Sequence, residues 1–264
     1  MTDHFLELDD LQIAYRDEGP KDGPVLVLSH ALGTDLSLWD GLVPLLPKSL
    51  RVLRYDHRGH GNSSVPKAPY GMGALIHDAE RLLDSLSLRD TVFLGLSLGG
   101  MVAQGLATKR LDLVRGMVLS NTAARISTAA IWQDRIRTVQ SEGVEPLVPA
   151  TMERWFAPRF RQSPEAQHWR AKLSATPPEG WAGCAAAIAG TDFYTTTAAL
   201  TLPTLAIAGS DDGTTPPDLV RETADLIKGS RFALIRGAGH LPLIEQPQTY
   251  ADLVSGFLES IGHV

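Results

Sequence analysis

Apolar-rich runs alternate with a helical stripe along the first half of the chain. The runs lie at 25–28, 51–56, 91–94 and 117–119, and each has the length of a strand. Between the second and third runs, residues 74–86 carry apolar side chains at the three- and four-residue spacing of a helix. Strands that alternate with helices predict a parallel sheet with helices on both faces and with functional sites at the carboxyl ends of its strands.

This alternation stops near residue 123 and resumes at residue 204. The segment between holds four of the five tryptophans, and its six prolines divide it into short helical pieces. Residues 123–194 carry eight Lys and Arg against seven Asp and Glu, whereas the rest of the chain carries 16 against 23. We therefore predict a helical lid over 123–195, inserted into an α/β core that is formed by 1–122 and 196–264.

Both ends of the chain add elements to this core. Residues 5–8 and 12–17 predict a two-stranded ribbon around Asp9 and Asp10. After the lid, the pattern predicts a strand at 204–208, a helix at 217–227, a strand at 232–235 and a final helix from 247 to 261. The length of 264 residues is compatible with one large domain that carries an insertion.

The composition narrows the class of protein. The chain is 44% hydrophobic and 20% charged, as globular proteins are, and its net charge of −6 opposes binding to nucleic-acid phosphates. Its one cysteine, Cys184, excludes an intrachain disulfide, and no apolar stretch reaches the ~18 residues of a membrane span. We expect a cytoplasmic protein that acts on a small molecule, without a nucleic-acid or membrane partner. A monomer and a homodimer are both compatible with the sequence.

The most specific motif is G-x-S-x-G at 95–99, with Ser97 at its centre. It follows the run 91–94 and precedes a helical pattern at 101–108, which is the context of a nucleophile on a tight strand-to-helix turn. Gly95 and Gly99 leave room for the strained backbone of such a turn. A glycine-rich turn with an N-cap serine is the structural alternative, but the context favours Ser97 as a nucleophile.

A serine hydroxyl needs a base that accepts its proton at neutral pH. Of the eight histidines, His240 is the candidate because it lies in a short loop after a predicted strand and comes last in the order serine, acid, histidine. The acid should then follow the strand 204–208. Asp211 and Asp212 both do, and spacing alone does not separate them.

An oxyanion hole needs two backbone N–H donors. Leu98, directly after the nucleophile and in the first turn of a helix, is expected to supply one, and the loop 30–33 is expected to supply the other. The glycine-rich loop 56–62 is interpreted as structural. The sequence has neither clustered metal ligands nor a glycine-rich dinucleotide fingerprint, so we expect no metal and no nicotinamide or flavin cofactor.

Together these motifs resemble those of the α/β-hydrolase superfamily over nearly the whole chain. The segments 29–33, 55–63, 95–100 and 237–240 carry the resemblance. It implies an α/β-hydrolase fold, with a mostly parallel central sheet flanked by helices and with an inserted helical lid.

The resemblance also implies roles for individual residues. The superfamily's acid motif G-x-x-D-x-x-T-P falls on 209–216, which selects Asp212 over Asp211. The second oxyanion donor falls on Leu32, although Ala31 stands where most members have glycine.

Within the superfamily, the chain is most similar to the 3-oxoadipate enol-lactonases of the β-ketoadipate pathway. The segments 30–34, 119–123, 154–156 and 183–188 carry this similarity, and esterases and perhydrolases share parts of them. The similarity implies hydrolysis of a small anionic enol-lactone to 3-oxoadipate in aromatic catabolism, through a Ser-His-Asp triad and an acyl-enzyme. Alternatives on the same fold are a general carboxylesterase or perhydrolase, a carbon–carbon bond hydrolase and a ligand-binding receptor.

A lactone that bears a carboxylate requires a cation or several N–H donors in its pocket, because an unpaired buried charge is costly. The predicted lid supplies candidates, with Arg135, Arg137 and Arg154 for the carboxylate and Trp132 and Trp155 as apolar walls. Each arginine could instead lie on a solvated helix face.

Overall fold

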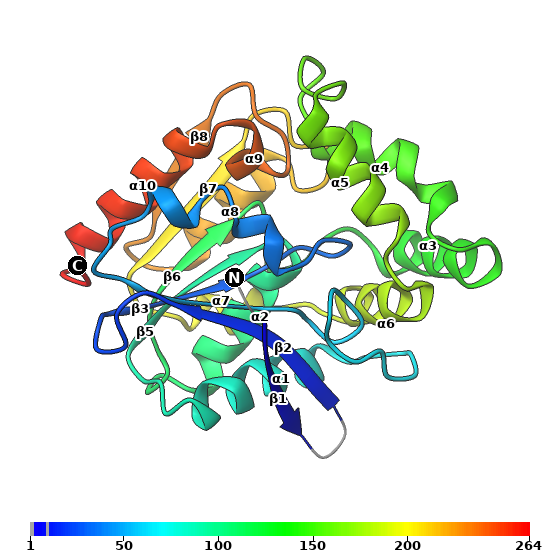
Figure 1. The fold of residues 1–264 in the computed structure, drawn as a ribbon. Coiled ribbons are helices and arrows are strands. Elements are labelled where there is room, and N and C mark those ends of the chain that lie inside the picture. The colour runs from blue at the N-terminus through cyan, green and yellow to red at the C-terminus, as the bar shows by residue number, and fades with distance from the viewer. Residues whose placement is uncertain (1–2, 9–10) are drawn as a thin grey trace.

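The computed structural model describes residues 3–8 and 11–264, so the predicted turn at Asp9 and Asp10 lies outside the described residues. Within them, one eight-stranded sheet has the order β1-β2-β4-β3-β5-β6-β7-β8 (Figure 1). The strands are β1 (His4–Leu8), β2 (Leu11–Glu18), β3 (Val25–Ser29), β4 (Arg51–Tyr55), β5 (Thr91–Leu96), β6 (Val114–Ser120), β7 (Thr204–Gly209) and β8 (Arg231–Ile235).

Helices connect most of the parallel strands. They are α1 (Met72–Ser85), α2 (Leu98–Lys109), α3 (Ala129–Glu142), α4 (Val148–Trp155), α5 (Pro164–Ser174), α6 (Pro178–Ala189), α7 (Tyr194–Ala198), α8 (Pro217–Leu226), α9 (Pro242–Glu245) and α10 (Pro247–Ser260). Short 3-10 helices are η1 (Leu36–Trp39), η2 (Val43–Leu45) and η3 (Glu145–Leu147).

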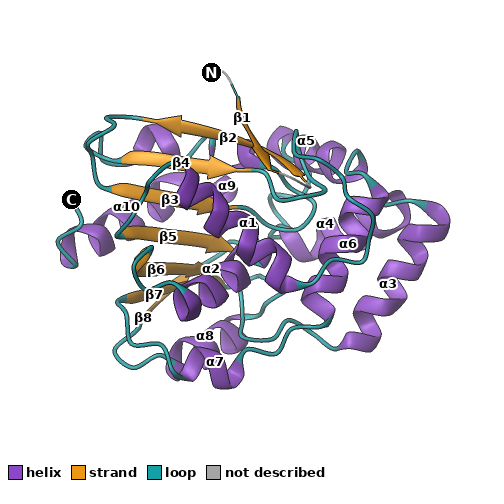
Figure 2. Cartoon of the chain, turned by 90° about the horizontal axis from the view of Figure 1, so that it is seen from below, coloured by secondary structure: helices purple, strands orange, loops and turns teal. Residues whose placement is uncertain are grey.

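The sheet is mostly parallel, as the alternation of strands and helices predicts. All neighbouring strands from β4 to β8 pair in parallel, whereas β2 pairs antiparallel with both β1 and β4. The strands β3, β5 and β7 are buried along their whole length, as expected where helices cover both faces of a parallel sheet. Helices α1, α2 and α8 lie on one face and α10 on the other (Figure 2).

The predicted core elements are confirmed, with bounds that differ by a few residues. The largest shifts, of three residues, are at β6, which begins at Val114 rather than at residue 117, and at α2, which begins at Leu98 rather than at residue 101. The reason at α2 is that Gly99 and Gly100 carry no apolar signal, although both are buried helical residues.

The segment 123–195 folds mainly into helices, and α3 to α6 lie beyond the carboxyl ends of the parallel strands (Figure 2). The ends of this segment meet, because the N–H of Phe193 donates a hydrogen bond to the carbonyl oxygen of Ala124 at 2.9 Å. The short helix α7 packs against α2 and α8 instead of continuing this layer. The loops after β3, β5, β7 and β8 therefore face the layer formed by α3 to α6. In the part of the chain that the structure describes, no helix has the length and apolar character that a membrane span requires.

Candidate active site

Ser97 occupies the turn between β5 and α2, with φ 55° and ψ −112°. A positive φ is uncommon for a residue that carries a side chain, and such strain persists only where the surroundings enforce it. A Cβ at Gly95 would lie 2.1 Å from the carbonyl oxygen of Gly99, and a Cβ at Gly99 would lie 2.1 Å from that of Ser29. Both glycines are thus needed for the close approach of β3, β5 and α2 at this turn.

The loops after β7 and β8 bring Asp212 and His240 together. Nδ1 of His240 lies 2.9 Å from Oδ2 of Asp212, and both side chains are buried. Because a carboxylate only accepts hydrogen bonds, Nδ1 carries the proton of the neutral ring and Nε2 does not. His240 and Ser97 line the same pocket. The imidazole is therefore held in the tautomer that can accept a proton from a serine hydroxyl.

Asp212 is surrounded by hydrogen-bond donors. Its Oδ1 accepts from the backbone N–H groups of Thr214 and Thr215 at 2.7 and 3.0 Å. Its Oδ2 accepts from the Thr215 hydroxyl and from Nδ2 of Asn121, both at 2.8 Å. Burial raises the pKa of Asp212, but the charge of His240 and these donors outweigh it and hold the pKa below its ordinary value.

Asp211, the other candidate acid, has a different partner from Asp212. Its side chain is exposed and accepts a hydrogen bond from the hydroxyl of Ser210 at 2.8 Å. The hydrogen bonds therefore distinguish Asp212, which contacts His240, from Asp211, whereas spacing in the sequence does not distinguish them.

Leu98 and Leu32, the predicted oxyanion donors, lie at the start of α2 and in the loop after β3. Among the described residues, neither backbone N–H has a hydrogen-bond acceptor.

The N–H of Gly33, next to Leu32, donates to Nε2 of His60 at 3.0 Å. Burial lowers the pKa of His60 to about 4, so the neutral ring can accept this bond. His60 belongs to the loop 56–62, and this contact agrees with a structural role for that loop.

The pocket above Ser97 and His240, called here the inner pocket, lies between the strand ends and helices α3 to α6. Its lining consists of Leu32, Ser97, Trp132, Arg135, Leu147, Thr151, Arg154, Trp155, Leu173, Trp181, Ile188, Thr214 and His240. The lid residues predicted for substrate binding that reach it are Trp132, Arg135, Arg154 and Trp155. Sequence reasoning missed the other lid residues because they come from separate helices, whose mutual placement depends on tertiary packing.

Arg135 and Arg154 are partly buried in the inner pocket, and neither forms a salt bridge with a described residue. The guanidinium of Arg135 lies 4.9 Å from the ring centroid of Trp132, and Nη2 of Arg154 donates to the hydroxyl of Thr151 at 3.0 Å. Burial lowers the pKa of both arginines, and the charge of Arg135 lowers that of Arg154 further. Two desolvated cations therefore line one wall of this pocket.

Arg137, the third predicted arginine, does not belong to the inner pocket. Its side chain is 68% exposed and pairs with Asp134 on the outer surface of α3. The reason is helical geometry, since each residue advances about 100° around the axis. Arg135 is three residues after Trp132 and shares its face, whereas Arg137 is two residues further and faces solvent.

The end of α4 is bonded to both loops that carry Asp212 and His240. The carbonyl oxygen of Trp155 accepts from the backbone N–H of His240 at 2.8 Å. The carbonyl oxygen of Arg154 accepts from the N–H of Gly213 at 3.1 Å. These bonds fix the pocket wall that carries Arg154 relative to the Asp212–His240 pair.

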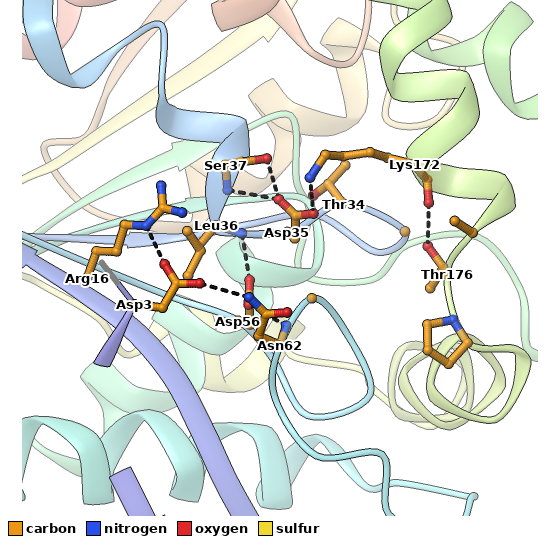
Figure 3. Close-up of a pocket in the computed structure, with 14 residues that line it drawn as sticks. Asp3, Arg16, Thr34, Asp35, Leu36, Ser37, Asp56, Asn62, Lys172 and Thr176 are labelled. Carbon is orange, nitrogen blue, oxygen red and sulfur yellow. Dashed lines mark hydrogen bonds and ion pairs between the residues drawn. The ribbon is translucent and has the colours of Figure 1, made fainter. Parts of the chain in front are cut away.

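A second cavity, called here the outer hollow, lies beside the loop 33–37 (Figure 3). In it, Lys172 of α5 points toward Asp35 at 2.5 Å, and Arg16 contacts Asp3 at 2.5 Å. Burial raises the pKa of Asp56 to about 7, although its carboxylate accepts backbone N–H bonds.

In the described part of the chain, no group of three or more His, Cys, Asp or Glu residues is arranged to hold a metal ion.

Comparisons with known proteins agree with this geometry. The sequence matches the family described as the alpha/beta hydrolase fold over residues 24–247. It is 34% identical over 264 residues to 3-oxoadipate enol-lactonase 2 of Acinetobacter baylyi, and the alignment covers 97% of each chain.

Two solved structures are similar over nearly their whole length. An enol-lactonase from Burkholderia xenovorans has a TM-score of 0.93 and 34% identity, with 97% of this chain and 100% of the other covered. A hydrolase from Pseudomonas aeruginosa has a TM-score of 0.93 and 40% identity, with 97% and 98% covered. The architecture expected from the sequence motifs is thereby confirmed.

Proposed function

Because the chain belongs to the α/β-hydrolase fold family, we propose that it is a serine hydrolase that opens a small anionic enol-lactone. The substrate proposed is 3-oxoadipate enol-lactone and the product is 3-oxoadipate, in aromatic catabolism. The similarity to two enol-lactonases supports this choice. The observation that carries it is the inner pocket, which joins Ser97 and His240 to Arg135 and Arg154.

Ser97, His240 and Asp212 form the proposed catalytic triad. Nε2 of His240 accepts the proton of the Ser97 hydroxyl while Oγ attacks the lactone carbonyl carbon. Asp212 holds the ring through Nδ1 and stabilises the imidazolium that forms. The backbone N–H groups of Leu32 and Leu98 donate to the carbonyl oxygen as it becomes negative.

Collapse of the tetrahedral intermediate breaks the bond between the carbonyl carbon and the ring oxygen. The acyl group stays on Ser97, and the ring oxygen leaves as an enolate that takes the proton from His240. The resulting enol tautomerises to a ketone, which does not readily reclose the ring. Water, deprotonated by His240, then attacks the acyl-enzyme, and the dicarboxylate product is released with Ser97 restored.

The substrate carboxylate is proposed to bind Arg135 and Arg154. A carboxylate placed between them would form the salt bridges that neither guanidinium forms with a described residue. The rings of Trp132 and Trp155 would contact the apolar part of the lactone.

The test compares kcat/KM on three substrates: the acidic enol-lactone, its methyl ester and an aryl acetate. We expect the wild-type protein to prefer the acidic lactone. Arg154→Ala should lower kcat/KM for this substrate by about 10–100-fold, the range of a lost charge-assisted hydrogen bond, and should change the methyl ester little. Arg137→Ala is the matched control, because it removes an exposed arginine from the same layer of helices and should leave all three values unchanged.

Equal or faster hydrolysis of the neutral esters by the wild-type protein would refute the lactonase assignment and identify a general carboxylesterase. Absence of all ester hydrolysis, together with no labelling of Ser97 by a fluorophosphonate, would refute the hydrolase and favour a binding protein.

A further inference from the structure

The tripeptide 120–122, at the carboxyl end of β6, contacts the loops of all three proposed triad residues. The carbonyl oxygen of Ser120 accepts from the backbone N–H of Ser97 at 2.9 Å, and the hydroxyl of Thr122 donates to the carbonyl oxygen of Ser97 at 2.7 Å. Between them, Asn121 reaches the other two loops. This tripeptide was not among the predicted site residues, and its side-chain contacts are the basis of the inference that follows.

Asn121 uses both ends of its side-chain amide. Nδ2 donates to Oδ2 of Asp212 at 2.8 Å and to the carbonyl oxygen of Gly239, the residue before His240, at 3.3 Å. Its Oδ1 accepts from the hydroxyl of Ser120 at 3.0 Å, which sets the orientation of the amide. One neutral side chain thereby links the loop of the acid to the loop of the base.

The backbone at Asn121 suits this residue type. Its φ is 46°, in the left-handed region where asparagine is enriched among residues with side chains, and its N–H donates to the carbonyl oxygen of Ile207 at 2.8 Å. Asn121 is fully buried, so a replacement without donors would leave Asp212 and the Gly239 carbonyl without this partner.

We propose that Asn121 is a positioning residue for the hydrolysis, which holds Oδ2 of Asp212 against Nδ1 of His240 and fixes the His240 loop through Gly239. The proposal rests on the triad assigned under the proposed function. Asn121 does not line the inner pocket, so it acts through Asp212 and His240 rather than through the substrate.

This role predicts a change in pH dependence as well as in rate. Oδ2 of Asp212 accepts from three groups, and loss of Asn121 changes both the charge on this oxygen and its position relative to Nδ1 of His240. The stability of the imidazolium relative to the neutral ring should then change, and the acidic limb of kcat/KM should move. Among the described residues, the charged groups around this pair include Asp211, which accepts from Ser210, and Glu245, which accepts from the N–H of Gly239. They also include Arg135 and Arg154, which line the inner pocket together with His240.

Asn121→Gly is the preferred variant because glycine adopts the left-handed backbone without strain. On an aryl acetate, we expect kcat to fall about 10–100-fold with KM changed less than about threefold, and we expect the acidic limb to move by at least about 0.3 pH unit. Asn121→Ala, which adds backbone strain, should show the same kinetic change with a lower melting temperature.

Gln104→Ala is the matched control. Gln104 is also a fully buried amide; it donates to the carbonyl oxygens of Gly100 and Ala123 and accepts from Thr197, without contact to Asp212 or His240. It should lower the melting temperature and leave the acidic limb of the pH profile in place.

The proposal is overturned if Asn121→Gly keeps the wild-type kcat, or if its loss of kcat comes without a change in the acidic limb, as a purely structural role predicts. If both Asn121 variants fail to fold, Asn121→Ser, which keeps a small polar side chain too short to reach Gly239, takes their place with the same expected shift. These outcomes are distinct from failure of the proposed function, in which the wild-type protein itself hydrolyses no aryl acetate.

Discussion

The inner pocket and the outer hollow differ in whether their cationic side chains form salt bridges. Leu32 lines the inner pocket and residues 33–37 line the outer hollow, α5 contributes to both, and each contains two cationic side chains. In the outer hollow, Lys172 pairs with Asp35 and Arg16 pairs with Asp3 (Figure 3). In the inner pocket, Arg135 and Arg154 form no salt bridge with a described carboxylate, and burial lowers the pKa of both.

The difference bears on what each cavity can bind. Cations that are already paired gain little from a further anion, whereas a desolvated and unpaired arginine is stabilised by one. Lys172 and Arg16 form salt bridges in the neighbouring outer hollow, so the lack of salt bridges at Arg135 and Arg154 is a particular property of the inner pocket. This contrast supports an anionic ligand next to Ser97 and argues against one in the outer hollow.

The largest expected effect is a loss of kcat, which should follow a substitution in the inner pocket and not one in the outer hollow. Ser97→Ala should lower kcat by about 10⁴-fold or more, because only the oxyanion hole and substrate binding would remain, while the melting temperature stays nearly unchanged. Thr176→Val, which removes a hydroxyl from the outer hollow, should leave kcat within about twofold of wild type. Steady-state kinetics and thermal unfolding measure both, and one tenth of normal activity in Ser97→Ala would place the nucleophile elsewhere.

A smaller but still large effect is expected at the acid. Asp212→Asn should lower kcat by up to about 10⁴-fold, because an amide favours the wrong tautomer of His240. Asp211→Asn should change kcat little, since its side chain is exposed and bonded to Ser210. Single-turnover kinetics on both variants measure the difference, and the reverse order of the two effects would exclude Asp212 as the acid.

The sequence predicts the fold and several residues of the inner pocket, but it does not predict the hydrogen bonds that hold the loops of the site in place. The elements of the core follow from local periodicity, and the context of Ser97 follows from a motif within one strand and one helix. Arg135 could be placed beside Trp132 from the period of α3, and the same period could have excluded Arg137.

Asn121 could not be placed in this way. It contacts Asp212 across 91 residues of sequence, and the contact exists because β6 and β7 are neighbours in the sheet. A local pattern carries no signal for such a contact until the strand order is known. The same holds for Trp181 and Leu173, which line the inner pocket from two different helices.

The smallest expected effect concerns stability, and it tests the comparison of the two cavities directly. Arg154→Met keeps the apolar stem and removes a desolvated cation that forms no salt bridge with a described residue, so it should raise the melting temperature by about 1–3 °C. Lys172→Met removes a cation whose pair with Asp35 is partly buried, so it should lower the melting temperature by a similar amount. Thermal unfolding without ligand measures both. A lower melting temperature in Arg154→Met would mean that the free protein already stabilises this guanidinium, and the inner pocket would then give no charge-based reason to bind an anion.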